Sequence, residues 1–140
     1  MKISEVMTSN PKTVKPTDSL QAAARIMRDE DAGAVPVVAE RRVVGMVTDR
    51  DIVVRAVADG DFDAKVSDIV SGDVITASPD MSTAQAAELM SEHQIRRLPV
   101  VDGDERLVGI VSLGDLAVKE RKEARMGETL ENISEGVKRH

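Results

Sequence analysis

The residues best suited to chemistry in this chain form a pattern that occurs twice. A hydroxyl residue stands three positions before a carboxylate in Thr48-Asp49-Arg50-Asp51 and again in Ser112-Leu113-Gly114-Asp115. Each run lies where an apolar, strand-like stretch gives way to a helix-like one. We therefore expect a hydroxyl, backbone N–H groups and a carboxylate at a helix N-terminus, where anions are favoured. An ionised aspartate there can accept charge-assisted hydrogen bonds from ligand hydroxyls, and the Thr or Ser hydroxyl can donate to an anion.

Helix capping is the competing interpretation of the same four residues. Ser, Thr and Asp are common at helix N-termini because their side-chain oxygens accept hydrogen bonds from free backbone N–H groups. A single copy would favour a cap over a binding site. The matched second copy favours binding, although caps also recur when a fold recurs, so both interpretations remain open.

An arginine pair gives the second half a chemistry that the first half lacks. Arg96-Arg97 directly precede the apolar run at Leu98, whereas the equivalent positions earlier in the chain hold Gly33-Ala34. Guanidinium groups match phosphate in a forked geometry, so we expect a phosphate-bearing ligand to bind more tightly in the second half. The alternative is that the arginines pair with nearby acids such as Glu92, which contributes little energy at a surface.

Composition argues against several other classes of protein. The chain has 25 acidic and 19 basic residues, a net charge of -6, which makes nucleic acid an unlikely partner. It has no cysteine and two histidines, too few for thiolate chemistry or a metal site built from these residues. We find no phosphate-binding loop, nucleophile elbow, G-x-G-x-x-G or H-E-x-x-H, and expect no enzymatic activity. Without a signal-like start or an apolar run near ~20 residues, we expect a cytoplasmic protein that does not contact membranes.

An internal repeat covers most of the chain. An offset of 63 residues sets Pro36 on Pro99 and aligns residues 5–38 with 68–101 without a gap. One inserted residue then moves the offset to 64, and Gly45 matches Gly109. Two copies are too few for a solenoid, so we expect a pair of repeats sharing one core.

Each repeat predicts the same order of elements. A short extended piece (12–14, 74–76) precedes a helix capped by Asp18 or Ser19 in the first copy and by Ser82 in the second. A strand (34–38, 98–101), a turn (40–42, 102–104), another strand (43–48, 107–112) and a second helix from Asp49 or Leu113 follow. Asp102-Gly103 is a hairpin signal. The predicted fold class is α/β of the α+β kind, with two β-α-β-β-α repeats packed with pseudo-twofold symmetry.

The repeat also predicts the domain organisation. We expect repeat 1 over 1–60, repeat 2 over 61–118 and a charged C-terminal helix or tail over 119–140. A repeat of about 60 residues buries little surface alone, so the two should form one cooperative unit, and fragments 1–60 and 61–140 should fold poorly.

The chain resembles the CBS-domain family, in the paired arrangement often called a Bateman module. The resemblance rests on Val35-Pro36-Val37-Val38 and Leu98-Pro99-Val100-Val101, on the runs from Gly45 to Asp51 and from Gly109 to Asp115, and on the opening Val6-Met7-Thr8. It covers about Ile3 to Leu116. Among such proteins the chain is similar to the stand-alone two-CBS type that includes hypoxic-response proteins.

The resemblance implies a regulatory module that binds adenosyl ligands (AMP, ADP, ATP or S-adenosylmethionine) in clefts between the repeats and requires no cofactor. It also implies a homodimer that signals to a separate, unidentified effector protein. We expect the dimer to hide the apolar residues Ile52, Val53, Ala56 and Val57. The alternative is a dimeric scaffold with the same fold that binds no nucleotide tightly. The candidate ligand-binding residues are Thr48, Asp51, Ser112, Asp115, Arg96, Arg97, Gly33, Val35, Ile95 and Met7. The apolar members of this set are explained equally well as core.

Overall fold

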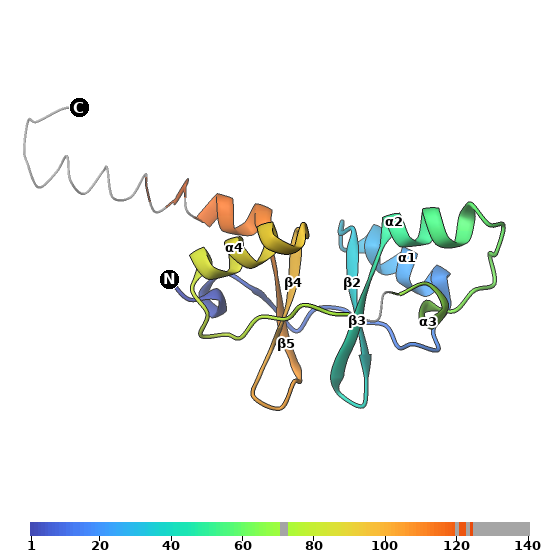
Figure 1. Cartoon of the computed structure of the whole chain (residues 1–140), viewed down its shortest axis with the longest axis horizontal. Coiled ribbons are helices and arrows are strands. Elements are labelled where there is room, and N and C mark those ends of the chain that lie inside the picture. Colours follow the sequence, from blue (N-terminus) through green and yellow to red (C-terminus); the bar gives the residue numbers. More distant parts are fainter. Residues whose placement is uncertain (71–72, 120, 123, 125–140) are drawn as a thin grey trace, which may run out of the picture.

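The structure is a computed structural model that describes residues 1–70, 73–119, 121–122 and 124 (Figure 1). Its elements, in chain order, are η1 (Ile3–Glu5), β1 (Thr8–Ser9), α1 (Leu20–Asp29), β2 (Ala34–Ala39), β3 (Arg42–Thr48), α2 (Asp49–Ile52), the π-helical η2 (Val53–Val57), α3 (Val66–Ile69), α4 (Thr83–His93), β4 (Arg97–Val101) and β5 (Leu107–Ser112). Residues 113–119 are also helical. Of the predicted C-terminal helix or tail, residues 120, 123 and 125–140 lie outside the described residues.

Two antiparallel hairpins form the centre of the molecule. β2 pairs with β3, and β4 pairs with β5, whose other edge pairs with β1. Figure 1 shows the hairpins side by side, with α1 and α2 beside the first and α4 beside the second. The α+β fold class is confirmed. The opening extended pieces are shorter than expected, since Val14 and Ala77 form only isolated parallel bridges to Val37 and Val100.

The two long helices begin at the serines that the sequence indicated. Ser19 accepts a hydrogen bond from the Ala22 N–H at 3.2 Å, so Ser19 rather than Asp18 caps α1. Ser82 accepts from the Gln85 N–H at 3.1 Å and caps α4. A side-chain oxygen in this position satisfies an N–H that has no partner inside the helix.

The second hairpin turns where we expected but for a different reason. Positive φ belongs to Glu105 (64°), not to Gly103. The Asp102 carboxylate accepts hydrogen bonds from the N–H groups of Asp104 and Arg106, at 2.9 and 3.0 Å. The predicted hairpin is therefore present, and the aspartate holds its turn through the side chain.

The buried hydrophobic side chains of the described residues form two clusters and not the single shared core that we expected, and each cluster takes residues from both sides of the repeat boundary. The first cluster consists of Val14, Leu20, Ala23, Met27, Val35, Val37, Val47, Ala56, Ala64, Val66 and Ile69. The second consists of Ile3, Ala77, Ala86, Met90, Leu98, Val100, Val111 and Leu116. Ile3 thus packs with the second half, while Ala64, Val66 and Ile69 pack with the first.

This exchange of opening segments is reciprocal. The Ile3 N–H donates to the Met81 carbonyl at 2.8 Å, and the Val66 N–H donates to the Asp18 carbonyl at 2.9 Å. Donors and acceptors in the two bonds are each displaced by 63 residues, the offset of the sequence repeat. The neighbouring bonds match too, because Ser4 donates to Pro79 at 3.1 Å and Ser67 to Pro16 at 2.9 Å. We call residues 3–6 and 66–69 the crossing segments.

The crossing segments bear on the domain division. A cut at residue 60 would separate the second crossing segment from the core that contains it. The boundaries 1–60 and 61–118 therefore stay a prediction from the sequence.

One apolar face differs from the expectation. Ala56 is buried in the first cluster and is not available to a partner, whereas Ile52 is only partly buried against that cluster. Val53 and Val57 are exposed, as the expected face requires, and Val54 and Phe62 are exposed as well. Among the described residues, no helix has the length and apolar character needed to cross a membrane.

Candidate functional site

The first Thr-x-x-Asp run forms a complete capping box at the start of α2. Thr48 Oγ1 accepts a hydrogen bond from the Asp51 N–H at 3.0 Å, and Asp51 Oδ2 accepts from the Thr48 N–H at 3.1 Å. The Asp51 side chain is 18% exposed, and its Oδ1 lies 3.9 Å from Arg55 Nε. In the first half, therefore, the capping interpretation accounts for the contacts of both residues.

The second run is capped on one side only. Ser112 Oγ accepts a hydrogen bond from the Asp115 N–H at 3.0 Å. Asp115 is exposed, and within the described ranges no hydrogen bond or ion pair reaches its carboxylate. The two carboxylates that the sequence made equivalent thus differ, because the second has no hydrogen-bond partner among the described residues.

The arginine pair lies beside this second carboxylate run. The Leu113 N–H donates to the Arg96 carbonyl at 2.8 Å, and Arg97 is paired with Ser112 across the hairpin. In the described part of the chain, neither arginine lies within 4.0 Å of a carboxylate oxygen. The expected alternative, pairing with Glu92, is therefore not what the structure contains.

The positions equivalent to the two arginines, Gly33 and Ala34, carry no charge in the first half. The Asp49 N–H donates to the Gly33 carbonyl at 3.0 Å, and Ala34 pairs with Thr48. A Cβ at Gly33 would lie 3.2 Å from Asp49 Oδ2. A side chain at this position would crowd Asp49, so the glycine permits the close approach of strand and helix.

The three apolar candidates are core residues to different degrees. Val35 is 1% exposed within the first cluster and offers no side-chain surface to a ligand. Met7 and Ile95 are partly buried against the second cluster. Met7 covers Gly109, where a Cβ would lie 2.5 Å from Met7 Sδ.

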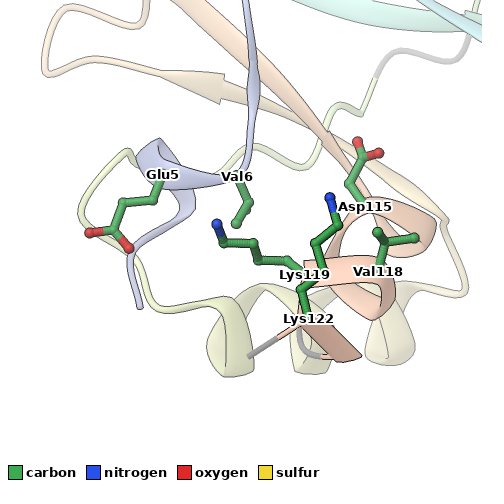
Figure 2. A pocket seen from close by; sticks show the side chains of 6 residues that line it. All are labelled: Glu5, Val6, Asp115, Val118, Lys119 and Lys122. Carbon is green, nitrogen blue, oxygen red and sulfur yellow. The ribbon is translucent and has the colours of Figure 1, made fainter. Parts of the chain in front are cut away.

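A hollow of about 250 Å³ lies next to Asp115 (Figure 2). Its lining is formed by Glu5, Val6, Asp115, Val118, Lys119 and Lys122. Figure 2 shows Glu5 and Val6, from the crossing segment, opposite the helix that carries Asp115 and both lysines. The volume is slightly below the ~300 Å³ at which ligand pockets usually begin, so the hollow fits part of a small molecule rather than the whole.

The sequence analysis missed this hollow, although the spacing of Lys119 and Lys122 could have indicated it. The sequence of residues 119–125 favours a solvent-exposed helix face, because acidic residues interrupt the basic ones. Lys119 and Lys122, however, stand four and seven positions after Asp115, a spacing that places all three on one face of a helix.

No group of His, Cys, Asp and Glu that could hold a metal ion occurs among the residues that the structure describes. The Ser-Asp run, the arginine pair and the hollow instead offer hydrogen-bond acceptors and positive charges, which suit a small organic ligand that carries hydroxyl and anionic groups.

The repeated sequence and fold correspond to a known family. The family model for the CBS domain matches residues 3–57 and again residues 66–120. The chain therefore belongs to the CBS-domain family and contains a pair of these domains, as the sequence motifs indicated.

Curated relatives of similar length are found in bacteria. CBS domain-containing protein YhcV of Bacillus subtilis is 44% identical over 133 residues, covering 94% of each chain. Hypoxic response protein 1 of Mycobacterium tuberculosis is 35% identical over 116 residues, covering 81% of this chain and 80% of its own. The predicted similarity to hypoxic-response proteins is thus confirmed, and neither relative is named as an enzyme.

Solved structures of similar fold include complexes with adenosyl compounds. The CBS domain pair of protein MJ0100, in complex with 5′-methylthioadenosine and S-adenosyl-L-methionine, has a TM-score of 0.80 and 29% identity, covering 88% of this chain and 98% of that one. CBSX2 in complex with AMP has a TM-score of 0.77 and 25% identity, with the same coverage.

The unequal capping gives a first prediction about stability. Asp51→Ala should lower the free energy of unfolding by about 1 kcal/mol, because a capping-box acceptor is lost. Asp115→Ala should cost less than about 0.5 kcal/mol, as is usual for an exposed substitution. Urea unfolding followed by circular dichroism measures both values, and the two variants serve as matched controls. Equal losses would show that the carboxylates have the same structural role.

Proposed function

We propose that this protein is a regulatory module that binds an adenosyl ligand (AMP, ADP, ATP or S-adenosylmethionine) through Asp115 and the residues around it. One observation carries the proposal: an exposed aspartate without an intramolecular partner, among the described residues, stands at a helix start beside two arginines. The adenosyl complexes of MJ0100 and CBSX2 support the choice of ligand.

The chemistry of the proposed site follows from its donors and acceptors. The Asp115 carboxylate can accept hydrogen bonds from both ribose hydroxyls, and the Ser112 hydroxyl can donate its proton to the ligand. Such charge-assisted bonds contribute about 1.5–3 kcal/mol each. Arg96 and Arg97 supply the guanidinium groups for a phosphate.

The first half offers a poorer version of the same site. Asp51 has its Oδ2 bonded to the Thr48 N–H, and Gly33 provides no charge. This half could hold a nucleoside but has no partner for a phosphate at the position of the arginines. The closed capping box of Thr48 and Asp51 therefore favours the alternative of no tight nucleotide binding, but only for the first half.

The proposed output is an interaction rather than a reaction. Adenine nucleotides are abundant in the cytoplasm, where we place the protein, and binding there would report their level. The described residues hold no arrangement of nucleophile and base, so the signal would pass to a separate effector protein.

A titration tests the proposed site. Wild-type protein should bind AMP with measurable heat, and Asp115→Ala should abolish the stronger binding event. Asp51→Ala should leave that event largely intact. Arg96→Ala should weaken AMP more than adenosine, because adenosine has no phosphate to lose. ADP, ATP and S-adenosylmethionine are titrated in parallel.

Two outcomes would contradict this assignment. Similar losses from Asp51→Ala and Asp115→Ala would show that the stronger site does not belong to the second half. Absence of heat or thermal shift with all four ligands at millimolar concentration would reject the nucleotide-sensor function and leave the dimeric scaffold.

We further propose that a second copy of the chain covers the exposed apolar face of η2. Val53 and Val57 are 57% and 47% exposed, and the nearby Phe62 is 73% exposed. Phe62 and Val57 also line a mostly apolar hollow of about 180 Å³ together with Leu20 and Ile52. Apolar surface gathered in one place commonly marks an interface, and twofold association of identical copies is the most common kind.

Light scattering tests this association. The wild type should have close to twice the 15.1 kDa mass of one chain. Val53→Asp with Val57→Asp should give a monomer, because two buried and unpaired carboxylates oppose the interface. Val44→Asp, at an exposed valine of β3, is the matched control and should remain dimeric. A wild-type protein that stays monomeric at all concentrations would contradict the proposal.

A further inference from the structure

The two halves differ in the residue that lies one helical turn after the site aspartate. Arg55 follows Asp51 by four positions, and Lys119 follows Asp115 by four positions. The offset between Arg55 and Lys119 is 64, so they are counterparts in the repeat. Residues four apart on a helix lie on the same face, so each basic residue shares a helix face with its aspartate.

Arg55 joins the aspartate to the crossing segment in the first half. Its Nη1 donates a hydrogen bond to the Ile69 carbonyl at 3.2 Å, and its Nε lies 3.9 Å from Asp51 Oδ1. Ile69 is the last residue of α3, which packs on the first core. The guanidinium therefore lies between the carboxylate and the crossing segment.

The second half has a hollow at the corresponding place. Lys119 lies with Glu5 and Val6 around the space of about 250 Å³ beside Asp115. Glu5 and Val6 are the counterparts of Asp68 and Ile69. A lysine has one compact ammonium group and lacks the forked donors of arginine, so it cannot hold a carboxylate and a carbonyl in the same planar geometry.

The helix backbone differs at the same point. Val53–Val57, with Arg55 at its centre, is π-helical, whereas residues 113–119 are α-helical. A π turn is wider than an α turn and is often found at functional sites. Backbone and side chain thus both distinguish the first half from the second at this position.

We propose that Arg55 is a further cause of the inequality between the two sites, because it closes the first half against the adenosyl ligand as a gate. This inference rests on the proposed function, and it adds a reason why the first half binds the ligand more weakly. A ligand whose hydroxyls approach Asp51 Oδ1 would compete with the guanidinium, whose Nε lies 3.9 Å from that oxygen and whose Nη1 is hydrogen-bonded to the Ile69 carbonyl. In the second half a ligand meets no such contact among the described residues, so each chain binds one ligand tightly.

A reciprocal exchange of the two basic residues tests this gate. Arg55→Lys should tighten binding of AMP at the first half by about tenfold, the equivalent of one net hydrogen bond to a charged group. Titration should then show two binding events per chain, and adding Asp51→Ala should remove the new one. Lys119→Arg should weaken the event at Asp115. Arg50→Lys, an exposed arginine on the same helix, is the matched control and should behave as wild type.

Hydrogen exchange gives a readout that needs no ligand. Arg55→Lys should accelerate exchange at the backbone amide of Val70, which directly follows the crossing segment and donates to the Val66 carbonyl. Arg50→Lys should not change it. Unchanged exchange in Arg55→Lys would show that the arginine does not hold the crossing segment and would overturn the proposal.

The titrations separate this inference from the proposed function. If the wild type binds AMP through Asp115 but Arg55→Lys gains no second event, the gate is rejected and the sensor function stands. If only Arg55→Lys binds AMP, the gate is supported and the assignment of the stronger site to Asp115 is rejected. If neither protein binds any of the four ligands, the proposed function fails and the gate fails with it.

Discussion

The reciprocal crossing of the two opening segments is the constraint on which the rest of the structure depends. Ile3 and Val66 are both 0% exposed, each in the core formed mainly by the other repeat. Their backbone bonds to Met81 and Asp18 repeat each other at the offset of the sequence. Since small domains bury little apolar surface, the loss of even one such residue from a core is a substantial fraction of its stability. The two halves are therefore connected through their cores and not only through a linker.

The same crossing builds the walls of both candidate sites. Glu5 and Val6 lie opposite the helix of Asp115 across the hollow of about 250 Å³. The Ile69 carbonyl accepts the hydrogen bond of Arg55 beside Asp51. A ligand in either place would contact a segment from one repeat and a helix from the other. Its binding would favour particular separations of segment and helix, which is how the proposed regulatory module could report a bound ligand.

Much of the fold could be predicted from the sequence, because the repeat offset and the caps are local signals. Ser19 and Ser82 begin the helices as predicted, and the strands at Pro36 and Pro99 lie as predicted. The crossing of Ile3 and Val66 could not be predicted, because periodicity shows that a residue is buried but not in which half. The unequal environments of Asp51 and Asp115 also escaped prediction, since they depend on the geometry of single side chains. Ala56 shows the same limit, because a π turn changes which residues of a helix face outward, and this alanine is buried where the sequence placed it on the open face.

A comparison of two fragments of nearly equal length tests the crossing most directly. Residues 10–70 contain all of the first core, from Val14 to Ile69, whereas residues 1–60 lack Ala64, Val66 and Ile69. Isotope-labelled NMR spectra and urea unfolding of both fragments are the measurement. Residues 10–70 should give the better dispersed spectrum and a cooperative transition, and residues 1–60 should give neither. A fragment 1–60 that folds as well as 10–70 would contradict the central role of the crossing, since its core would then not need the crossing segment.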